Sequence, residues 1–166
     1  MARVLVLMGS DSDLPTMRKA IDALSEFGIE TEVAVASAHR TPEKVVELVR
    51  AADGDGTCAI IAGAGMAAAL PGVVAAHTTL PVIGVPLSGS ALGGTDALYS
   101  IVQMPPGIPV ATVGIDAAAN AGLLAAQIAA VSDPGISEAL KRHRTTMAEQ
   151  VEARAQKVRE ELQSSQ

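Results

Sequence analysis

Residues 37–42 read Ser-Ala-His-Arg-Thr-Pro and place a proton-transfer group beside a permanent cation. The imidazole of His39 can exchange a proton near neutral pH, and the guanidinium of Arg40 suits a phosphate group. The segment follows a predicted strand and precedes a predicted helix, which Thr41 is expected to cap through its hydroxyl and Pro42 to begin. We therefore predict a site for a phosphorylated small molecule, with His39 as the acid/base.

Two further loops carry polar or small residues that suit the same ligand. Residues 9–13, Gly-Ser-Asp-Ser-Asp, offer hydroxyls that can donate to phosphate and carboxylates that can accept from ribose hydroxyls. Residues 63–65, Gly-Ala-Gly, permit a ligand to approach the backbone closely. The two carboxylates could instead only cap a turn, and the two glycines could be ordinary turn residues. The six-residue glycine fingerprint of a dinucleotide site is missing.

The elements that must position these loops are short apolar strands alternating with helices. We predict strands at residues 3–8, 31–36, 58–62, 81–85 and 110–113, and helices at residues 14–27, 42–52, 66–76, 95–102 and 117–131. Pro71 is expected to interrupt the third helix, and Pro86 to end the fourth strand. Strands that are apolar on both faces indicate an α/β fold with a central parallel sheet between two helical layers. Ligands bind at the carboxyl edge of such sheets, where the three loops can converge.

The C-terminal part differs in composition from the rest of the chain. We expect residues 1–133 to form a single α/β catalytic domain and residues 134–166 a helical arm, with the last four residues frayed. A narrow apolar stripe runs along the predicted helix and consists of Leu140, Met147, Val151, Ala155, Val158 and Leu162. The stripe could pack on the helix's own domain or against another subunit, and the spacing of the apolar residues fits both.

Composition excludes several classes of function. Of the 166 residues 49% are hydrophobic, the net charge is −6, and the aromatic residues are one Phe and one Tyr. These values argue against base-stacking surfaces and against general binding to nucleic acid. We predict no membrane span, a cytoplasmic location, a core position for the lone Cys58, and no metal, since no cluster has ligand spacing.

Four segments, in this order, resemble the family of N5-carboxyaminoimidazole ribonucleotide mutases of de novo purine biosynthesis. They are residues 9–13, residues 37–42, Leu-Pro-Gly at 70–72 and Ser-Ile-Val-Gln-Met-Pro at 100–105. The resemblance covers nearly the whole chain. It implies a flavodoxin-like three-layer sandwich, a homo-octamer, and a reaction without cofactor or metal. That reaction moves a carboxylate from the exocyclic nitrogen to ring carbon 4 of 5-aminoimidazole ribonucleotide.

The resemblance also implies roles for individual residues. His39 would be the acid/base, and three residues would hold the phosphate: Ser10, Ser37 and Arg40. Asp13 would take the ribose hydroxyls, residues 63–65 would wall the carboxylate pocket, and residues 103–105 would lie near a subunit contact. The complete substrate-binding set that we predict is Ser10, Ser12, Asp13, Ser37, Ala38, Arg40, Gly63, Ala64, Gly65, Ala69 and Leu70.

The third loop departs from the family pattern. Members commonly read Gly-Ala-Ala-His-Leu-Pro-Gly where residues 66–72 read Met-Ala-Ala-Ala-Leu-Pro-Gly, so Met66 replaces a glycine and Ala69 a histidine. We still predict a mutase, because small side chains can hold carbon dioxide and one histidine can move the proton.

Two other functions remain open. One is a carboxylase that adds free carbon dioxide to the same ribonucleotide. The other is a non-catalytic phospho-acceptor domain of flavodoxin-like fold. The second would need an Asp after the third strand and a Lys after the fifth, where the chain has Gly63 and Gly114.

Overall fold

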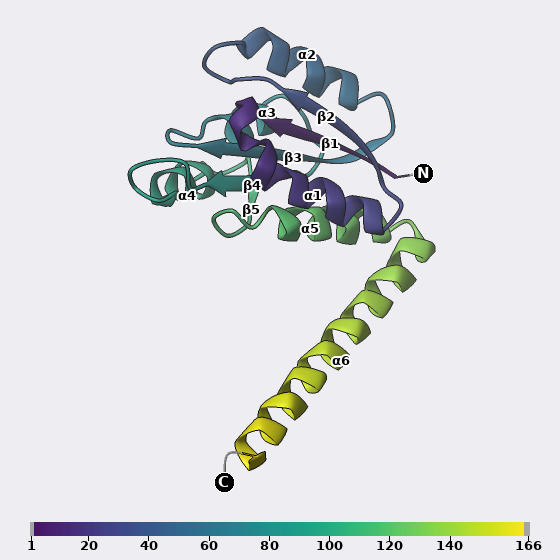
Figure 1. Cartoon of the computed structure of the whole chain (residues 1–166). Helices are drawn as coiled ribbons and strands as arrows, with labels where there is room; N and C mark the ends of the chain where they lie inside the picture. Colours follow the sequence, from purple (N-terminus) through teal and green to yellow (C-terminus); the bar gives the residue numbers. More distant parts are fainter. Residues whose placement is uncertain (1, 165–166) are drawn as a thin grey trace.

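Five parallel strands form the centre of the computed structural model, which describes residues 2–164 (Figure 1). The strands are β1 (Arg3–Met8), β2 (Glu30–Val35), β3 (Thr57–Gly65), β4 (Val82–Leu87) and β5 (Ala111–Thr112). The helices are the 3-10 turn η1 (Asp11–Asp13), α1 (Leu14–Glu26), α2 (Pro42–Ala52), α3 (Leu70–Ala75), α4 (Thr95–Val102), α5 (Ala118–Ala130) and α6 (Pro134–Ser164). The strand order is β2-β1-β3-β4-β5, with every pairing parallel. This is the flavodoxin-like order, which confirms the predicted fold class.

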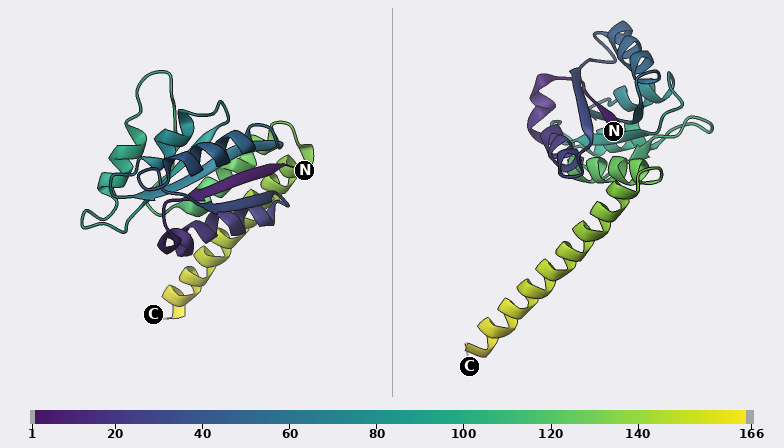
Figure 2. Two further views of the ribbon diagram at one scale, coloured as in Figure 1. Left: turned by 90° about the horizontal axis from the view of Figure 1, so that it is seen from above. Right: turned by 90° about the vertical axis from the view of Figure 1, so that its right-hand side faces the viewer.

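The sheet has one apolar core on each face, because successive side chains of a strand point to opposite sides. Val4 and Val6 of β1 belong to the core covered by α1 and α5. Leu5 and Leu7 belong to the opposite core, covered by α2, α3 and α4. Two further views show the helices on both sides of the sheet (Figure 2). The predicted three-layer arrangement is therefore confirmed.

Two strands are longer than the sequence analysis predicted. β3 continues through Gly65, because Gly63 and Gly65 pair with Val85 and Leu87 of β4. The glycines suggested a loop. A strand between two neighbouring strands is held by backbone hydrogen bonds, however, and glycine can form these as well. β4 likewise passes through Pro86, whose carbonyl accepts from the N–H of Asp116 at 2.9 Å on the β5 side. β5 pairs with β4 only at residues 83 and 84, so the sheet needs no donor from Pro86 there.

The third helix also differs from the prediction. α3 begins at Leu70, and Pro71 lies in its first turn rather than interrupting it. A proline nitrogen in the first turn has no intrahelical acceptor to lose, so the helix tolerates it there. Residues 66–69 are consequently a loop between β3 and α3, and this loop borders the site described below.

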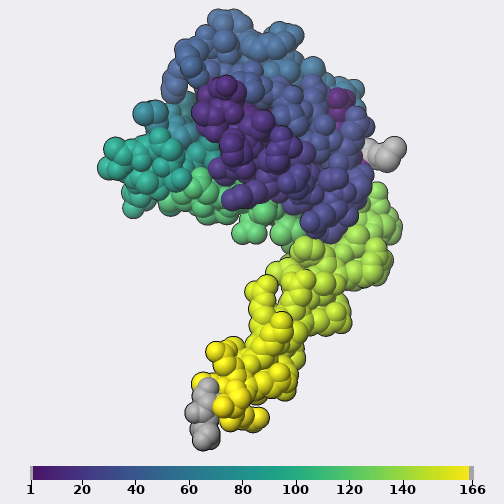
Figure 3. Space-filling view, in the orientation of Figure 1, coloured from purple at the N-terminus to yellow at the C-terminus, as the bar shows by residue number. Residues whose placement is uncertain are grey.

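α6 extends away from the rest of the molecule (Figures 1 and 3). Within residues 134–164 only Ile136 is buried, and Leu140 packs partly against the core of α1 and α5. Four stripe residues further along are 51–65% exposed: Met147, Val151, Val158 and Leu162. Beyond Leu140, the stripe therefore does not pack on the helix's own domain. The helix continues through Ser164, beyond the start of the expected fraying, and residues 165 and 166 lie outside the described residues.

Within the described part of the chain, no helix combines the length and the apolar character needed to cross a membrane. Cys58 is half-buried, and burial raises the pKa of its thiol.

Candidate active site

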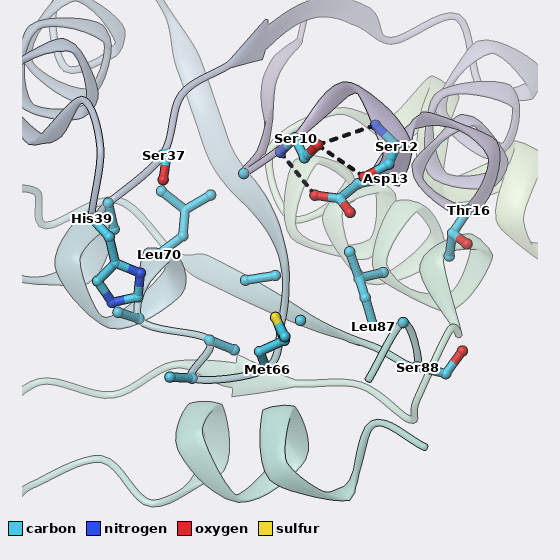
Figure 4. Close-up of a pocket in the computed structure, with 18 of the residues that line it drawn as sticks. Ser10, Ser12, Asp13, Thr16, Ser37, His39, Met66, Leu70, Leu87 and Ser88 are labelled. Atoms are coloured by element: carbon cyan, nitrogen blue, oxygen red, sulfur yellow. Dashed lines mark hydrogen bonds between the residues drawn. The ribbon is translucent and has the colours of Figure 1, made fainter. Parts of the chain in front are cut away.

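A cavity of about 790 Å³ lies at the carboxyl edge of the sheet (Figure 4). The loops that follow all five strands contribute to its wall. Of the residues predicted from the sequence, the lining includes Ser10, Ser12, Asp13, Ser37, Ala38, His39, Arg40, Ala64, Gly65, Ala69 and Leu70. The three loops singled out in the sequence thus meet in one place, as parallel strand ends should.

The first loop is a compact capped turn. The hydroxyl of Ser10 accepts from the N–H of Ser12 at 3.3 Å. The backbone N–H of Ser10 donates to Oδ2 of Asp13 at 2.9 Å. Asp13 therefore does cap the turn, which was the alternative to a ligand role, while also facing the cavity. Burial raises the pKa of the Asp13 carboxyl, and the N–H groups of Ser10 and Gly9 oppose that rise.

The second loop connects to the first through Arg40. One terminal nitrogen of its guanidinium donates to the carbonyl of Gly9 at 3.1 Å, and Nε donates to the hydroxyl of Ser37 at 3.4 Å. The backbone N–H of Arg40 also donates to that hydroxyl, at 3.3 Å. These bonds hold the cation between the two loops, beside the hydroxyls that were predicted to bind phosphate.

Thr41 does not cap α2 through its hydroxyl, contrary to the prediction. Its Oγ1 instead accepts from the N–H of Ser37 at 2.9 Å and donates to the Ser37 carbonyl at 3.2 Å. The residue is therefore used to close the 37–41 turn on itself. The result is a rigid turn that presents residues 38–40 to the cavity.

His39 lies at the rim of the cavity and is exposed. Its ring makes no hydrogen bond to any other residue in the range 2–164. Figure 4 shows the ring on the side of the cavity opposite the first loop. An imidazole in this position keeps both nitrogens available for a ligand.

Gly63 is the one predicted site residue that the cavity lining does not include. A Cβ at this position would lie 2.4 Å from Sδ of Met17, so the glycine makes room for α1 against β3. The carboxylate pocket proposed from the sequence would thus be bounded by Ala64 and Gly65 and by the 66–69 loop. Met66 in that loop has φ +57°, a left-handed conformation that favours glycine.

The loops after β4 and β5 also border the cavity, and they were not predicted from the sequence. The end of β4, these two loops and α1 add Leu87, Ser88, Gly89, Asp116 and Thr16 to the lining. Oδ1 of Asp116 accepts from the N–H of Ser88 at 3.0 Å, which fixes the two loops together. The topology could have predicted these residues, because the loops after β4 and β5 leave the same carboxyl edge of the parallel sheet as the first three loops.

The chemistry available in the cavity is that of one imidazole, one guanidinium, two carboxylates (Asp13 and Asp116), several hydroxyls and a wall of small side chains. Across residues 2–164 no group of three His, Cys, Asp or Glu residues is placed to hold a metal ion. The arrangement can bind a phosphorylated ligand and transfer a proton beside an apolar surface.

Known proteins are similar to this chain in sequence and in fold. The family model described as AIR carboxylase matches residues 3–150. The N5-carboxyaminoimidazole ribonucleotide mutase of Pyrococcus abyssi is 57% identical over 89% of this chain and 84% of its own length. A phosphoribosylaminoimidazole carboxylase of Schizosaccharomyces pombe is 51% identical over 92% of this chain but only 28% of its own. The crystal structure of PurE from Treponema denticola superposes with a TM-score of 0.84 at 34% identity, covering 91% of this chain and 94% of that one. The chain belongs to the AIR carboxylase family.

Proposed function

We infer that the chain is an isomerase that converts N5-carboxyaminoimidazole ribonucleotide to 4-carboxy-5-aminoimidazole ribonucleotide. The family assignment supports this reaction. So does the Pyrococcus abyssi relative, which is named a mutase and which the match covers over 84% of its length. The observation that carries it in the structure is the pairing of His39 and Arg40. A cation bound between two loops adjoins an imidazole that has no hydrogen-bond partner within residues 2–164.

The substrate phosphate would bind at Arg40, with the hydroxyls of Ser10 and Ser37 as further donors. Hydrogen bonds from a guanidinium to phosphate are shorter and stronger than neutral ones. The ribose would lie toward Asp13, and the ring toward His39 and the 66–69 loop. Figure 4 shows Asp13 and His39 on different sides of the cavity, which supports this placement.

One histidine is enough to balance the protons of the reaction. The bond between the exocyclic nitrogen and the carboxylate carbon breaks, its electron pair stays on nitrogen, and nitrogen takes a proton from the His39 imidazolium. Carbon 4 then attacks the released carbon dioxide and forms the new carbon–carbon bond. The proton displaced from carbon 4 then passes to the neutral His39, which restores the aromatic ring of the product and the imidazolium. No second acid is needed at Ala69.

The small residues at the end of β3 and in the 66–69 loop would hold the carbon dioxide beside carbon 4. Ala64, Gly65 and residues 67–69 line the cavity and offer neither charge nor side-chain hydrogen bonds to water. Holding two reactants together can be worth an effective molarity of about 10⁵–10⁸ M. That gain depends on the carbon dioxide not escaping between the two steps.

A carboxylase that uses free carbon dioxide is the second candidate, favoured by the name of the Schizosaccharomyces pombe relative. The two reactions differ in the origin of the new carboxylate. Unlabelled N5-carboxyaminoimidazole ribonucleotide should therefore be supplied in buffer that contains labelled bicarbonate. A mutase gives product with little label at early times. Product labelled to the level of the medium would assign the carboxylase reaction instead.

We further propose that the enzyme acts as a homo-octamer in the cytoplasm, without cofactor or metal. Residues 134–166 would form an arm beyond the catalytic domain of residues 1–133 and pack against a neighbouring copy. The exposed apolar stripe on α6 supports this arrangement, because a neighbouring copy would remove it from water.

A further inference from the structure

Two residues other than glycine adopt a positive φ within residues 2–164, and both line the cavity. They are Met66, at 57°, and Asp116, at 55°. Asp116 has a local explanation, because Asp tolerates this conformation and its backbone and side chain bond Pro86 and Ser88. Met66 has no polar side-chain atom that could do the same. A strained backbone conformation at a cavity wall points to a functional role.

The side chain of Met66 is exposed, in addition to the strained conformation of its backbone. It is 64% exposed, although it is apolar. Figure 4 shows it between His39 and Leu87, directed into the space that the loops enclose. Its neighbours in the loop, residues 67–69, are all alanines. Met66 is thus the one side chain of this loop long enough to reach across the cavity mouth.

A methionine suits such a position. Its unbranched side chain has three rotatable bonds and fits irregular apolar surfaces. Between the two steps of the proposed reaction the cavity contains a small, neutral molecule, carbon dioxide. The alanine wall bounds that molecule on one side but does not close the open side.

We propose that Met66 covers the mouth of the cavity during turnover and keeps the carbon dioxide beside carbon 4. This role rests on the proposed mutase function and deepens it. Met66 touches no reacting atom in this role and is a positioning residue. It makes the reaction specific for the carboxylate of the substrate over carbon dioxide from solution.

The test compares Met66→Gly with Met66→Leu in the labelled-bicarbonate experiment. Glycine accepts φ +57° without strain, so this variant should fold, and thermal unfolding checks that it does. Leucine keeps the apolar bulk and is the matched control. Affinity for 5-aminoimidazole ribonucleotide should stay within about twofold in both variants, because the phosphate contacts belong to other loops.

We expect Met66→Gly to incorporate about tenfold more label at early times than the unmodified enzyme, since an open site loses the retained reactant. Met66→Leu should stay close to the unmodified enzyme. Equal label in all three proteins, or an equal rise in both variants, would overturn the role of Met66 and leave the mutase function intact. Full labelling by the unmodified enzyme would overturn the mutase function itself, and the role of Met66 with it.

Discussion

His39 and Arg40 are adjacent in the sequence, but the structure treats them differently. Arg40 is bound by Gly9 on one side and by Ser37 on the other. His39 is exposed at the rim of the same cavity and lacks a hydrogen-bond partner within the described residues. A held cation suits binding, whereas a proton-transfer group must change partners during the reaction. The two residues therefore predict different kinetic effects when they are changed.

Replacing His39 should affect turnover more than binding. His39→Asn removes the proton transfer, and general acid–base catalysis is worth about 10²- to 10⁴-fold in rate. We expect kcat to fall by at least the lower value, with affinity for 5-aminoimidazole ribonucleotide retained, measured by steady-state kinetics and calorimetry. His77→Asn is the matched control, because His77 is exposed and lies outside the cavity lining. Near-normal turnover in His39→Asn would refute the assignment.

Replacing Arg40 should affect binding more than turnover. A hydrogen bond to a charged group contributes about 1.5–3 kcal/mol, which corresponds to about 10- to 150-fold in affinity. Arg40→Ala should therefore raise KM by about that factor and change kcat far less. Lys44→Ala is the control, since Lys44 pairs with Glu47 on the exposed side of α2. A KM unchanged in Arg40→Ala would mean that the phosphate binds elsewhere.

At the level of elements, the sheet edge opposite the cavity is held by one ion-pair cluster. Arg3 of β1 donates to Glu32 of β2 at 2.6 Å and to Asp55, which precedes β3. The hydroxyl of Thr57 donates to the same Asp55 carboxyl at 2.6 Å. The hydrogen bonds from Thr57, followed by the charge of Arg3, hold the pKa of Asp55 below its ordinary value of 3.8. The cluster thus links the amino ends of three neighbouring strands.

This cluster predicts how stability depends on pH. The lowered pKa of Asp55 means that its carboxylate stabilises the fold above about pH 4, and that this contribution is lost as pH falls through the lowered pKa. Asp55→Asn should be less stable than the unmodified chain at about pH 7, and the difference should shrink at about pH 3. Urea unfolding at the two pH values measures it.

The matched control for the pH experiment is Asp22→Asn, at an exposed position of α1. The Asp13 carboxyl acts in the opposite direction, because burial raises its pKa and its ionisation costs stability as pH rises. A stability difference for Asp55→Asn that is the same at both pH values would show that the carboxylate's charge is not what stabilises this edge.

Most elements could be predicted from the sequence, and three of the boundary errors share a cause. Apolar runs and helical spacing identified all five strands and all six α-helices of the described chain, since burial of side chains determines both patterns. The fifth strand was predicted at residues 110–113 and is shorter in the structure, Ala111–Thr112. Three other errors fell where glycine or proline was taken as a breaker: β3 passes through Gly65, β4 through Pro86, and α3 contains Pro71. In each case neighbouring strands or the position within a helical turn decide the outcome, and neither can be seen in a local window.

The site was predicted to a similar extent. The four motifs predicted the family, which the comparisons confirm. Loops with a distinctive pattern of His, Arg, Ser and Asp were found, whereas Ser88 and Asp116 were missed, because their segments are ordinary in composition. Gly63 was assigned to the pocket, but the cavity lining does not include it, and the absence of a Cβ there leaves room for Met17. The register of a strand decides to which face of the sheet a small residue points, and composition alone does not give the register.

At the scale of the whole molecule, the uncovered stripe on α6 predicts self-association. Light scattering after gel filtration should give a mass several times the 16.8 kDa of one chain, and an octamer is expected. Val151→Glu combined with Val158→Glu should shift the protein to smaller species, because it places charges in an apolar contact. Ala153→Glu, outside the stripe on the same helix, is the control. A monomer at micromolar concentration would contradict the proposal.

The length of α6 limits what can cover its stripe. A helix rises about 1.5 Å per residue, so the exposed part from residue 144 onward reaches about 30 Å, roughly the diameter of a small domain. A partner that buries the whole stripe must therefore offer a surface about as long as the helix. In an assembly of copies, the helix would then fix the distance between neighbouring subunits. Inserting seven residues into the exposed part would lengthen it by about 10 Å, by the same rise, and would keep the stripe on nearly the same face. The spacing between catalytic cavities would then be set by the number of residues in one helix.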